Sequence, residues 1–194
     1  MTTLSAILLV GGQSRRMGVD KASVVIAGET MWQRQTRILS GLGAKALWVS
    51  ARTAPAWVSP PWEVIIDEPP SRGPLSGVAV ALGRLETSHL LVLAIDLPRM
   101  TTEHLRKLWC LARRGVGVIP WHDDYFEPLC AIYPAEALSV AEELLAGGDL
   151  ALQHLAQRLV NRGLAEACNL TADDLPHYLN MNTASDLIGQ VLPE

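Results

Sequence analysis

A loop rich in glycine and basic residues follows the first apolar run of the chain. Residues 4–10 are almost wholly apolar, and the chain continues as GGQSRRMGVDK over 11–21. Adjacent glycines let backbone N–H groups approach phosphate oxygens, and arginine and lysine side chains neutralise their charge. The loop is neither a Walker A loop nor a GxGxxG fingerprint. We therefore favour a phosphate-binding loop over a solvent-exposed tight turn.

Other polar residues give weaker signals. Asp123 and Asp124 are a candidate metal-binding pair, but a polar turn between two strands is the favoured interpretation. We expect His89 at a strand edge and His104 on the exposed face of a helix, and assign neither a role. Glu127 fits an orienting carboxylate and a charge at the start of a strand equally well. No Ser-His-Asp triad is visible.

Length and composition indicate one globular domain covering 1–194. Hydrophobic residues make up 49% of the chain and charged residues 19%, which excludes disordered, collagen-like and coiled-coil proteins. No apolar stretch reaches the roughly 18–20 residues of a membrane span, and 1–10 lack the features of a secretory signal. The three cysteines are widely spaced, which argues against a disulfide scaffold and a zinc site. We expect a cytoplasmic protein.

Charge is distributed unevenly along the chain. Residues 1–114 hold 14 basic and 8 acidic side chains, a net charge of +6, whereas 115–194 hold 2 and 12, a net charge of −10. Arginine accounts for 13 of the 16 basic residues, and its planar guanidinium suits phosphate oxygens. A basic first part predicts a polyanionic ligand there, and the acidic remainder argues against a protein that coats nucleic acid.

Strand-like and helix-like segments alternate, and they must position the loop. We expect strands at 4–10, 23–26, 46–49, 64–66, 89–94, 116–119, 129–133 and 165–170. We expect helices at 31–42, capped by Thr30, at 74–85, at 134–146, at 150–160 and at 184–190, and one capped by Thr102. This order predicts an α/β fold whose doubly wound sheet is mostly parallel, with helices on both faces. Two strands without a helix between them, from 116 to 133, predict one antiparallel strand.

Five segments in order resemble the molybdenum cofactor guanylyltransferase family, within the molybdopterin nucleotidyltransferases. The loop LVGGQSRRMGVDK resembles the family signature LAGGxSxRMGxDK. Four later segments also match: Asp67 with GPLSG at 73–77, DLP at 96–98, EPLCAIY at 127–133, and NMNTASDL at 180–187. The resemblance covers about 5–190. It implies a Rossmann-like nucleotidyltransferase fold that transfers GMP from GTP to molybdopterin and releases pyrophosphate.

The resemblance also implies site residues. The nucleotide would contact Leu9, Val10, Gly11, Gly12, Lys21, Ser50, Asp67, Gly77 and Asp96. Arg16, Lys21 and Asp96 would be catalytic, with Asp96 ligating Mg²⁺, for which Mn²⁺ is an alternative. Asn180 and Asn182 would face the pterin substrate. This divides the domain into a nucleotide-binding part, 1–114, and a pterin-side part, 115–194. Further partners would be proteins of cofactor biosynthesis or molybdoenzyme maturation, and the chain would be a monomer or a weak homo-oligomer.

The chain departs from the family pattern at three positions. Val10 replaces the usual alanine, Ser50 stands where an asparagine is common, and Arg99 follows DLP where an aromatic residue is usual. The base contact, the nucleotide contact of Ser50 and the pocket of the second substrate are therefore in question. Trp57 lies in a loop where it could stack on the pterin or a partner, or simply cover the loop.

Three alternatives remain open. A cytidylyltransferase acting on the same cofactor usually has LAAG in the loop, and Gly11-Gly12 favours guanine instead. Nucleotidyltransferases for sugar phosphates or isoprenoid precursors share the fold, but the sugar-phosphate enzymes are usually longer. A non-catalytic nucleotide-binding or cofactor-delivery protein is the third, and the presence of Lys21, Asp67 and Asp96 together argues against it.

Overall fold

A computed structural model describes residues 2–10, 20–66 and 73–181. Five predicted site residues, Gly11, Gly12, Arg16, Asp67 and Asn182, lie outside the described residues, as does the helix expected at 184–190.

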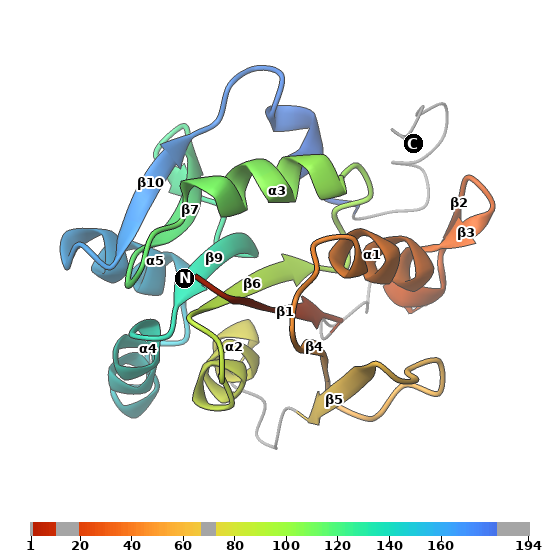
Figure 1. Ribbon diagram of the computed structural model, residues 1–194, viewed down its shortest axis with the longest axis horizontal. Helices are drawn as coiled ribbons and strands as arrows, with labels where there is room; N and C mark the ends of the chain where they lie inside the picture. The colour runs from red at the N-terminus through yellow and green to blue at the C-terminus, as the bar shows by residue number, and fades with distance from the viewer. Residues whose placement is uncertain (1, 11–19, 67–72, 182–194) are drawn as a thin grey trace.

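The described chain is built around one mixed sheet (Figure 1). Its strands are β1 (Leu4–Leu9), β4 (Leu47–Ala51), β5 (Trp62–Ile66), β6 (His89–Ala94), β7 (Gly117–His122), β8 (Tyr125–Phe126), β9 (Cys130–Pro134) and β10 (Ala165–Asn169). The order across the sheet is β10-β7-β9-β6-β1-β4-β5, and β8 pairs with β7. β9 runs antiparallel to both β6 and β7, whereas β10–β7, β6–β1, β1–β4 and β4–β5 are parallel pairs. The predicted sheet with its antiparallel strand is confirmed.

Helices cover both faces of this sheet. The helices α1 (Met31–Ser40) and α3 (Thr102–Leu111) pack on one face. The helices α2 (Pro74–Gly83), α4 (Ala137–Ala146) and α5 (Leu152–Asn161) pack on the other. Figure 1 shows α2 and α4 on the side of β6 and β1 opposite to α1 and α3. Strand β1 serves both layers because its side chains alternate between them. Ile7 and Leu9 join the α2 side, and Leu4, Ala6 and Leu8 join the α1 side.

The segment between β1 and α1 places a lysine near the sheet edge. A 3-10 turn, η1 (Lys21–Ser23), is capped by Asp20, whose Oδ1 accepts from the N–H of Ala22 at 3.0 Å. The hairpin of β2 (Val25–Ile26) and β3 (Glu29–Thr30) follows. Only its first strand overlaps the strand expected at 23–26, because η1 occupies residues up to 23.

Helix caps explain where α1 and α3 begin. Thr30 and Gln33 form the reciprocal capping box that starts α1, which confirms Thr30 as its cap. The cap of α3 is Thr101, whose hydroxyl accepts from the N–H of His104 at 3.1 Å, and the prediction of Thr102 is wrong by one residue. The Thr102 hydroxyl instead donates to the carbonyl of Ile38 at 3.0 Å and joins α3 to α1.

Candidate active site

The carboxyl ends of β1, β4 and β6 meet at one edge of the sheet and bring several predicted site residues together. The N–H of Val10 donates to the carbonyl of Ser50 at 3.1 Å, and the N–H of Ile95 donates to the carbonyl of Leu9 at 3.1 Å. Asp96 comes directly after Ile95. Leu9, Val10, Ser50 and Asp96 therefore line the same edge, which is where ligands bind in open α/β sheets.

Lys21 and Asp96 form an ion pair at this edge. The Lys21 Nζ lies 2.8 Å from the Asp96 Oδ2, and the two side chains are 19% and 23% exposed. A partly exposed ion pair contributes about 1 kcal/mol or less to folding stability. Each group is accessible, however, and each can exchange its partner for a ligand. An ammonium can bind phosphate oxygens, and a carboxylate can bind a hard cation.

A cavity of about 230 Å³ lies beside Lys21. It is lined by Val10, Asp20, Ala22, Ala51, Arg52, Thr53, Pro55 and Trp57. The Trp57 indole stacks on Trp32 of α1, with ring centroids 4.9 Å apart and planes within 11°. The sequence left open whether Trp57 stacks on a ligand or partner or covers its loop. In the structure it packs on Trp32 at the wall of the cavity. Sequence analysis missed Arg52 and Thr53, although their place directly after β4 could have indicated them.

Ser50 of β4 and Gly77 of α2 pack against each other near the carboxyl end of β4. Both residues are buried, and a Cβ added to Gly77 would lie 2.5 Å from the Ser50 Oγ. The glycine therefore permits α2 to approach β4 closely. The nucleotide contacts expected of both residues stay predictions, and the observed arrangement shows packing.

The segment that carries Asn180 returns to Asp96. The N–H of Met181 donates to the carbonyl of Asp96 at 2.8 Å, and Met181 is buried while Asn180 is exposed. Asn180 thus directly precedes a residue whose backbone is bonded to that of Asp96, although positions 96 and 180 are far apart in sequence. Glu127 is at the same edge, because β9 is antiparallel and starts where β6 ends; the N–H of Ala94 donates to the carbonyl of Leu129 at 2.8 Å. Burial raises the pKa of the Glu127 carboxyl.

The histidine predictions need correction. His104 is buried rather than exposed, and its Nε2 lies 2.8 Å from the Tyr178 hydroxyl of η2 (Leu175–Tyr178). His89 is wholly buried because β6 is a central strand, and its Nε2 lies 2.9 Å from the carbonyl of Arg113. Both imidazoles are held by internal hydrogen bonds, which a pattern of apolar residues does not reveal.

The acidic pair Asp123-Asp124 is a turn. Both residues have positive φ, 46° and 66°, and they join β7 to β8 as a tight hairpin. Within the described ranges no group of three or more His, Cys, Asp or Glu side chains could hold a metal ion. The hairpin geometry confirms the polar-turn interpretation.

The sequence over residues 6–167 matches the family model described as MobA-like NTP transferase domain. The chain belongs to this family. A probable molybdenum cofactor guanylyltransferase of Opitutus terrae is 35% identical over 95% of this MobA-like chain and 93% of its own length. The molybdenum cofactor guanylyltransferase of Syntrophotalea carbinolica is 28% identical, over 94% and 88%.

Solved structures of the same fold support the assignment. Molybdopterin-guanine dinucleotide biosynthesis protein A of Archaeoglobus fulgidus superposes with a TM-score of 0.69 at 23% identity and covers 94% of each chain. The 4-diphosphocytidyl-2C-methyl-D-erythritol synthase of Anaerococcus prevotii superposes with a TM-score of 0.71 at 12% identity, over 96% of this chain and 93% of its own. These similarities show that the chain has the Rossmann-like nucleotidyltransferase fold. Its family and its curated relatives show that it is a nucleotidyltransferase. In the described part of the chain, no helix is long and apolar enough to cross a membrane.

The donor set at Asp96 fits magnesium. Mg²⁺ is usually bound by one or two carboxylates together with phosphate oxygens and waters. The Asp96 carboxylate is partly exposed at the sheet edge, and its Oδ2 pairs with Lys21. The lysine suits the phosphates that would accompany the ion. Such a magnesium site would be complete only when a bound nucleotide adds its phosphate oxygens to the Asp96 carboxylate.

Proposed function

We propose that this protein transfers GMP from GTP to molybdopterin and releases pyrophosphate. A terminal phosphate oxygen of the pterin attacks the α-phosphorus of GTP, and the bond to the β-phosphate oxygen breaks. The electron pair of that bond leaves with the pyrophosphate. The attacking oxygen is already ionised, so the reaction needs no general base, and the protein mainly positions reactants and neutralises charge.

The Lys21–Asp96 pair is the observation that carries this proposal. Its ammonium and carboxylate, 2.8 Å apart, lie at the sheet edge beside a cavity lined by Val10 and Trp57. Lys21 would bind the triphosphate and offset the charge that develops on the departing pyrophosphate. Asp96 would hold Mg²⁺, or Mn²⁺ in its place, and a bound cation would supply further neutralisation of the phosphates. Asn180, held close by the Met181–Asp96 hydrogen bond, would face the pterin.

Guanine is the proposed base because both relatives above carry guanylyltransferase names. In addition, two glycines at positions 11 and 12, which have no side chains, would leave room for a purine. The experiment is a thermal-shift panel with GTP, CTP and ATP, each with magnesium and with EDTA. Ligand at 100 times its Kd stabilises by about 2.7 kcal/mol. We expect Mg-GTP to raise Tm most, and labelled GMP to appear on molybdopterin. A preference for CTP would instead favour the cytidylyltransferase, and binding without transfer would favour a delivery protein.

We further propose that the reaction takes place in the cytoplasm and that the chain works as a monomer or weak homo-oligomer. Molybdopterin would be received from, and the dinucleotide passed to, proteins of cofactor biosynthesis or molybdoenzyme maturation. Light scattering of the purified protein tests the oligomeric state.

A further inference from the structure

The segment Asp96–Arg99 is held by hydrogen bonds to four consecutive backbone carbonyls. The donors come from α1 and from the segment around η2, far away in sequence. Met181 N–H donates to Asp96 O at 2.8 Å, Gln35 Nε2 to Leu97 O at 2.7 Å, Arg34 Nε to Pro98 O at 2.7 Å, and His177 Nδ1 to Arg99 O at 2.7 Å. A carbonyl only accepts, so the His177 proton is on Nδ1. The backbone of residues 96–99, called the Asp96 loop below, is thus held in place by residues from other parts of the chain.

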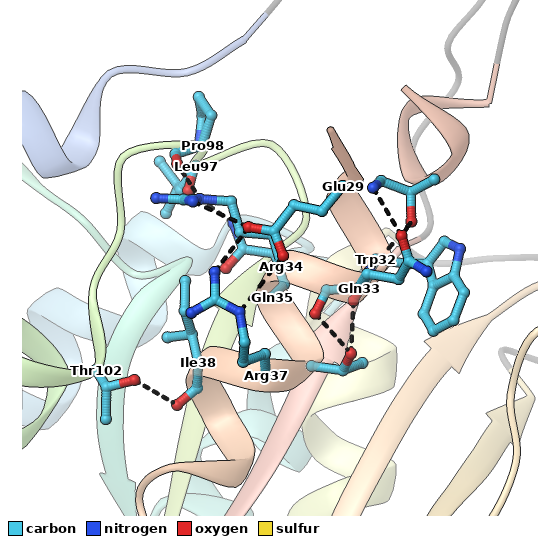
Figure 2. A network of polar contacts seen from close by, with 12 residues as sticks. Glu29, Trp32, Gln33, Arg34, Gln35, Arg37, Ile38, Leu97, Pro98 and Thr102 are labelled. Carbon is cyan, nitrogen blue, oxygen red and sulfur yellow. Dashed lines mark hydrogen bonds and ion pairs between the residues drawn. The ribbon is translucent and has the colours of Figure 1, made fainter. Parts of the chain in front are cut away.

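We infer that Arg34 and Gln35 are positioning residues that set where the Asp96 carboxylate meets the metal ion. This inference rests on the proposed function, in which Asp96 binds magnesium. Neither residue is among the substrate contacts predicted from the family resemblance. Each acts through the backbone of the residues that follow Asp96, as Figure 2 shows for Arg34, Gln35 and the carbonyls of Leu97 and Pro98.

The burial of these two polar side chains argues for a role beyond packing. Arg34 is 4% exposed, and its Nη1 also donates to the Glu29 Oε1 at 3.1 Å. Gln35 is wholly buried, and its Oε1 has no hydrogen-bond partner among the described residues. An apolar pair of similar volume would avoid the cost of burying a guanidinium and an unsatisfied amide oxygen. An apolar pair would, however, have no hydrogen-bond donors for the carbonyls of Leu97 and Pro98.

The same helix is tied to the lysine of the ion pair. Met31, the first residue of α1, donates its N–H to the carbonyl of Val24 at 2.9 Å, and Val24 in turn donates to the carbonyl of Lys21 at 3.3 Å. Helix α1 is therefore bonded to the Lys21 segment at its start and to the Asp96 loop through its second turn. It fixes the two charged groups relative to each other, and small displacements of such groups are costly in a site that works by positioning.

Arg37 provides a matched control. It binds the same Glu29, with its Nη2 2.7 Å from Oε1, but it is 56% exposed and donates to no carbonyl of the Asp96 loop. Arg34→Met and Arg37→Met each remove an arginine from Glu29, and only the first releases Pro98. Gln35→Met is the second test variant. It should fold, because it deletes an unsatisfied buried oxygen and leaves Leu97 O with the N–H of Met100 at 3.2 Å.

The measurement is GTP affinity by calorimetry, once with magnesium and once with EDTA. For Arg34→Met and Gln35→Met we expect the GTP affinity in EDTA to be unchanged. The factor by which magnesium raises GTP affinity, called the magnesium gain below, should fall about tenfold or more. Arg37→Met should keep both values. Wild-type magnesium dependence in a folded Gln35→Met or Arg34→Met variant would overturn the inference.

Asp96→Asn separates this inference from the proposed function. If Asp96→Asn loses the magnesium-dependent gain while both α1 variants keep it, the metal site stands and the positioning role fails. If Asp96→Asn keeps the gain, the magnesium site of the proposed function fails. Arg34→Lys adds a rescue test. The lysine ammonium lies one bond beyond the position of the Arg34 Nε and can still donate to the carbonyl of Pro98, so we expect a partial return of the magnesium-dependent increase in GTP affinity.

Discussion

At the scale of single residues, Lys21 combines accessibility with a fixed position. The η1 turn and its Asp20 cap hold the backbone, and the ammonium points at Asp96. We expect Lys21→Ala to lower GMP transfer by at least about 10²-fold, because one well-placed electrostatic donor is lost. The melting temperature should change little, since the side chain lies at the surface of the edge. Single-turnover kinetics beside a thermal melt check both, and near-normal turnover would contradict the assignment.

Gly77 is a second residue whose environment permits a sharp prediction. A methyl group there would meet the Ser50 Oγ at 2.5 Å, so Gly77→Ala should lower the free energy of unfolding by about 1–3 kcal/mol. The double variant Ser50→Ala/Gly77→Ala should recover part of this loss, because the Ser50 Cβ lies farther away, at 3.3 Å.

Gly83, at the end of the same helix, is the control. Nothing lies within 4 Å of a Cβ added there, so Gly83→Ala should raise stability by up to about 1 kcal/mol. Urea denaturation measures all three variants. Equal instability of the single and double variants at position 77 would show that Ser50 is not the obstacle.

At the scale of elements, η2 docks on α3 through a buried histidine. Desolvation, with the neighbouring His177 second, lowers the pKa of His104 from 6.5 to about 4, while Asp174 opposes the shift and Lys107 adds to it slightly. Folded His104 is therefore neutral, with Nε2 at the Tyr178 hydroxyl. Between pH 6.5 and 4 the unfolded chain binds a proton that the folded chain does not.

The consequence is a loss of stability as the pH falls through that window. From pH 7 to pH 5 we expect the wild type to lose about 2 kcal/mol more unfolding free energy than His104→Gln, which cannot titrate there. Urea titrations at the two pH values measure this difference. Equal losses in both proteins would show that His104 does not supply the pH dependence.

The elements themselves were largely predictable from the sequence. The limits expected for the strand 89–94 match β6 residue for residue, because the apolar run at 90–95 lies between the polar residues His89 and Asp96 and leaves little freedom. The cap of α3 was misplaced since two threonines stand side by side and only the backbone conformation decides between them. The contacts of Arg34 with Pro98 could not be predicted, as they join segments 64 residues apart through a backbone carbonyl.

At the scale of the whole molecule, two apolar layers share one sheet. Leu39 of α1 is buried in one layer and Leu144 of α4 in the other, and strands such as β1 contribute to both. Leu39→Ala and Leu144→Ala should each cost about 2–5 kcal/mol. Because the layers share the sheet, each variant should shift the transitions seen by fluorescence and by far-ultraviolet circular dichroism together. Separate transitions would contradict the single domain expected from the sequence.

The resemblance, and not residue spacing, grouped the predicted site residues from distant parts of the chain. It anticipated that Lys21, Asp96 and Asn180 belong together, and the structure places their segments at one sheet edge. Its expectations for Gly11, Gly12, Arg16, Asp67 and Asn182 remain predictions, because these residues lie outside the described chain. For Ser50 and Gly77 the family pattern could not reveal the mutual packing, which depends on how closely α2 approaches β4.

The stacked indoles of Trp32 and Trp57 have an optical consequence. Two indoles with ring centroids 4.9 Å apart couple their electronic transitions. Such coupling gives a paired circular-dichroism signal of opposite signs, whose amplitude depends on the distance between the rings and on the angle between their in-plane transition dipoles. One indole belongs to a helix fixed on the sheet, and the other lines the cavity beside Lys21. Any displacement of the Trp57 segment when the cavity fills would change the amplitude of that signal. Circular dichroism of the two tryptophans would therefore report whether a ligand occupies the cavity, without an added dye.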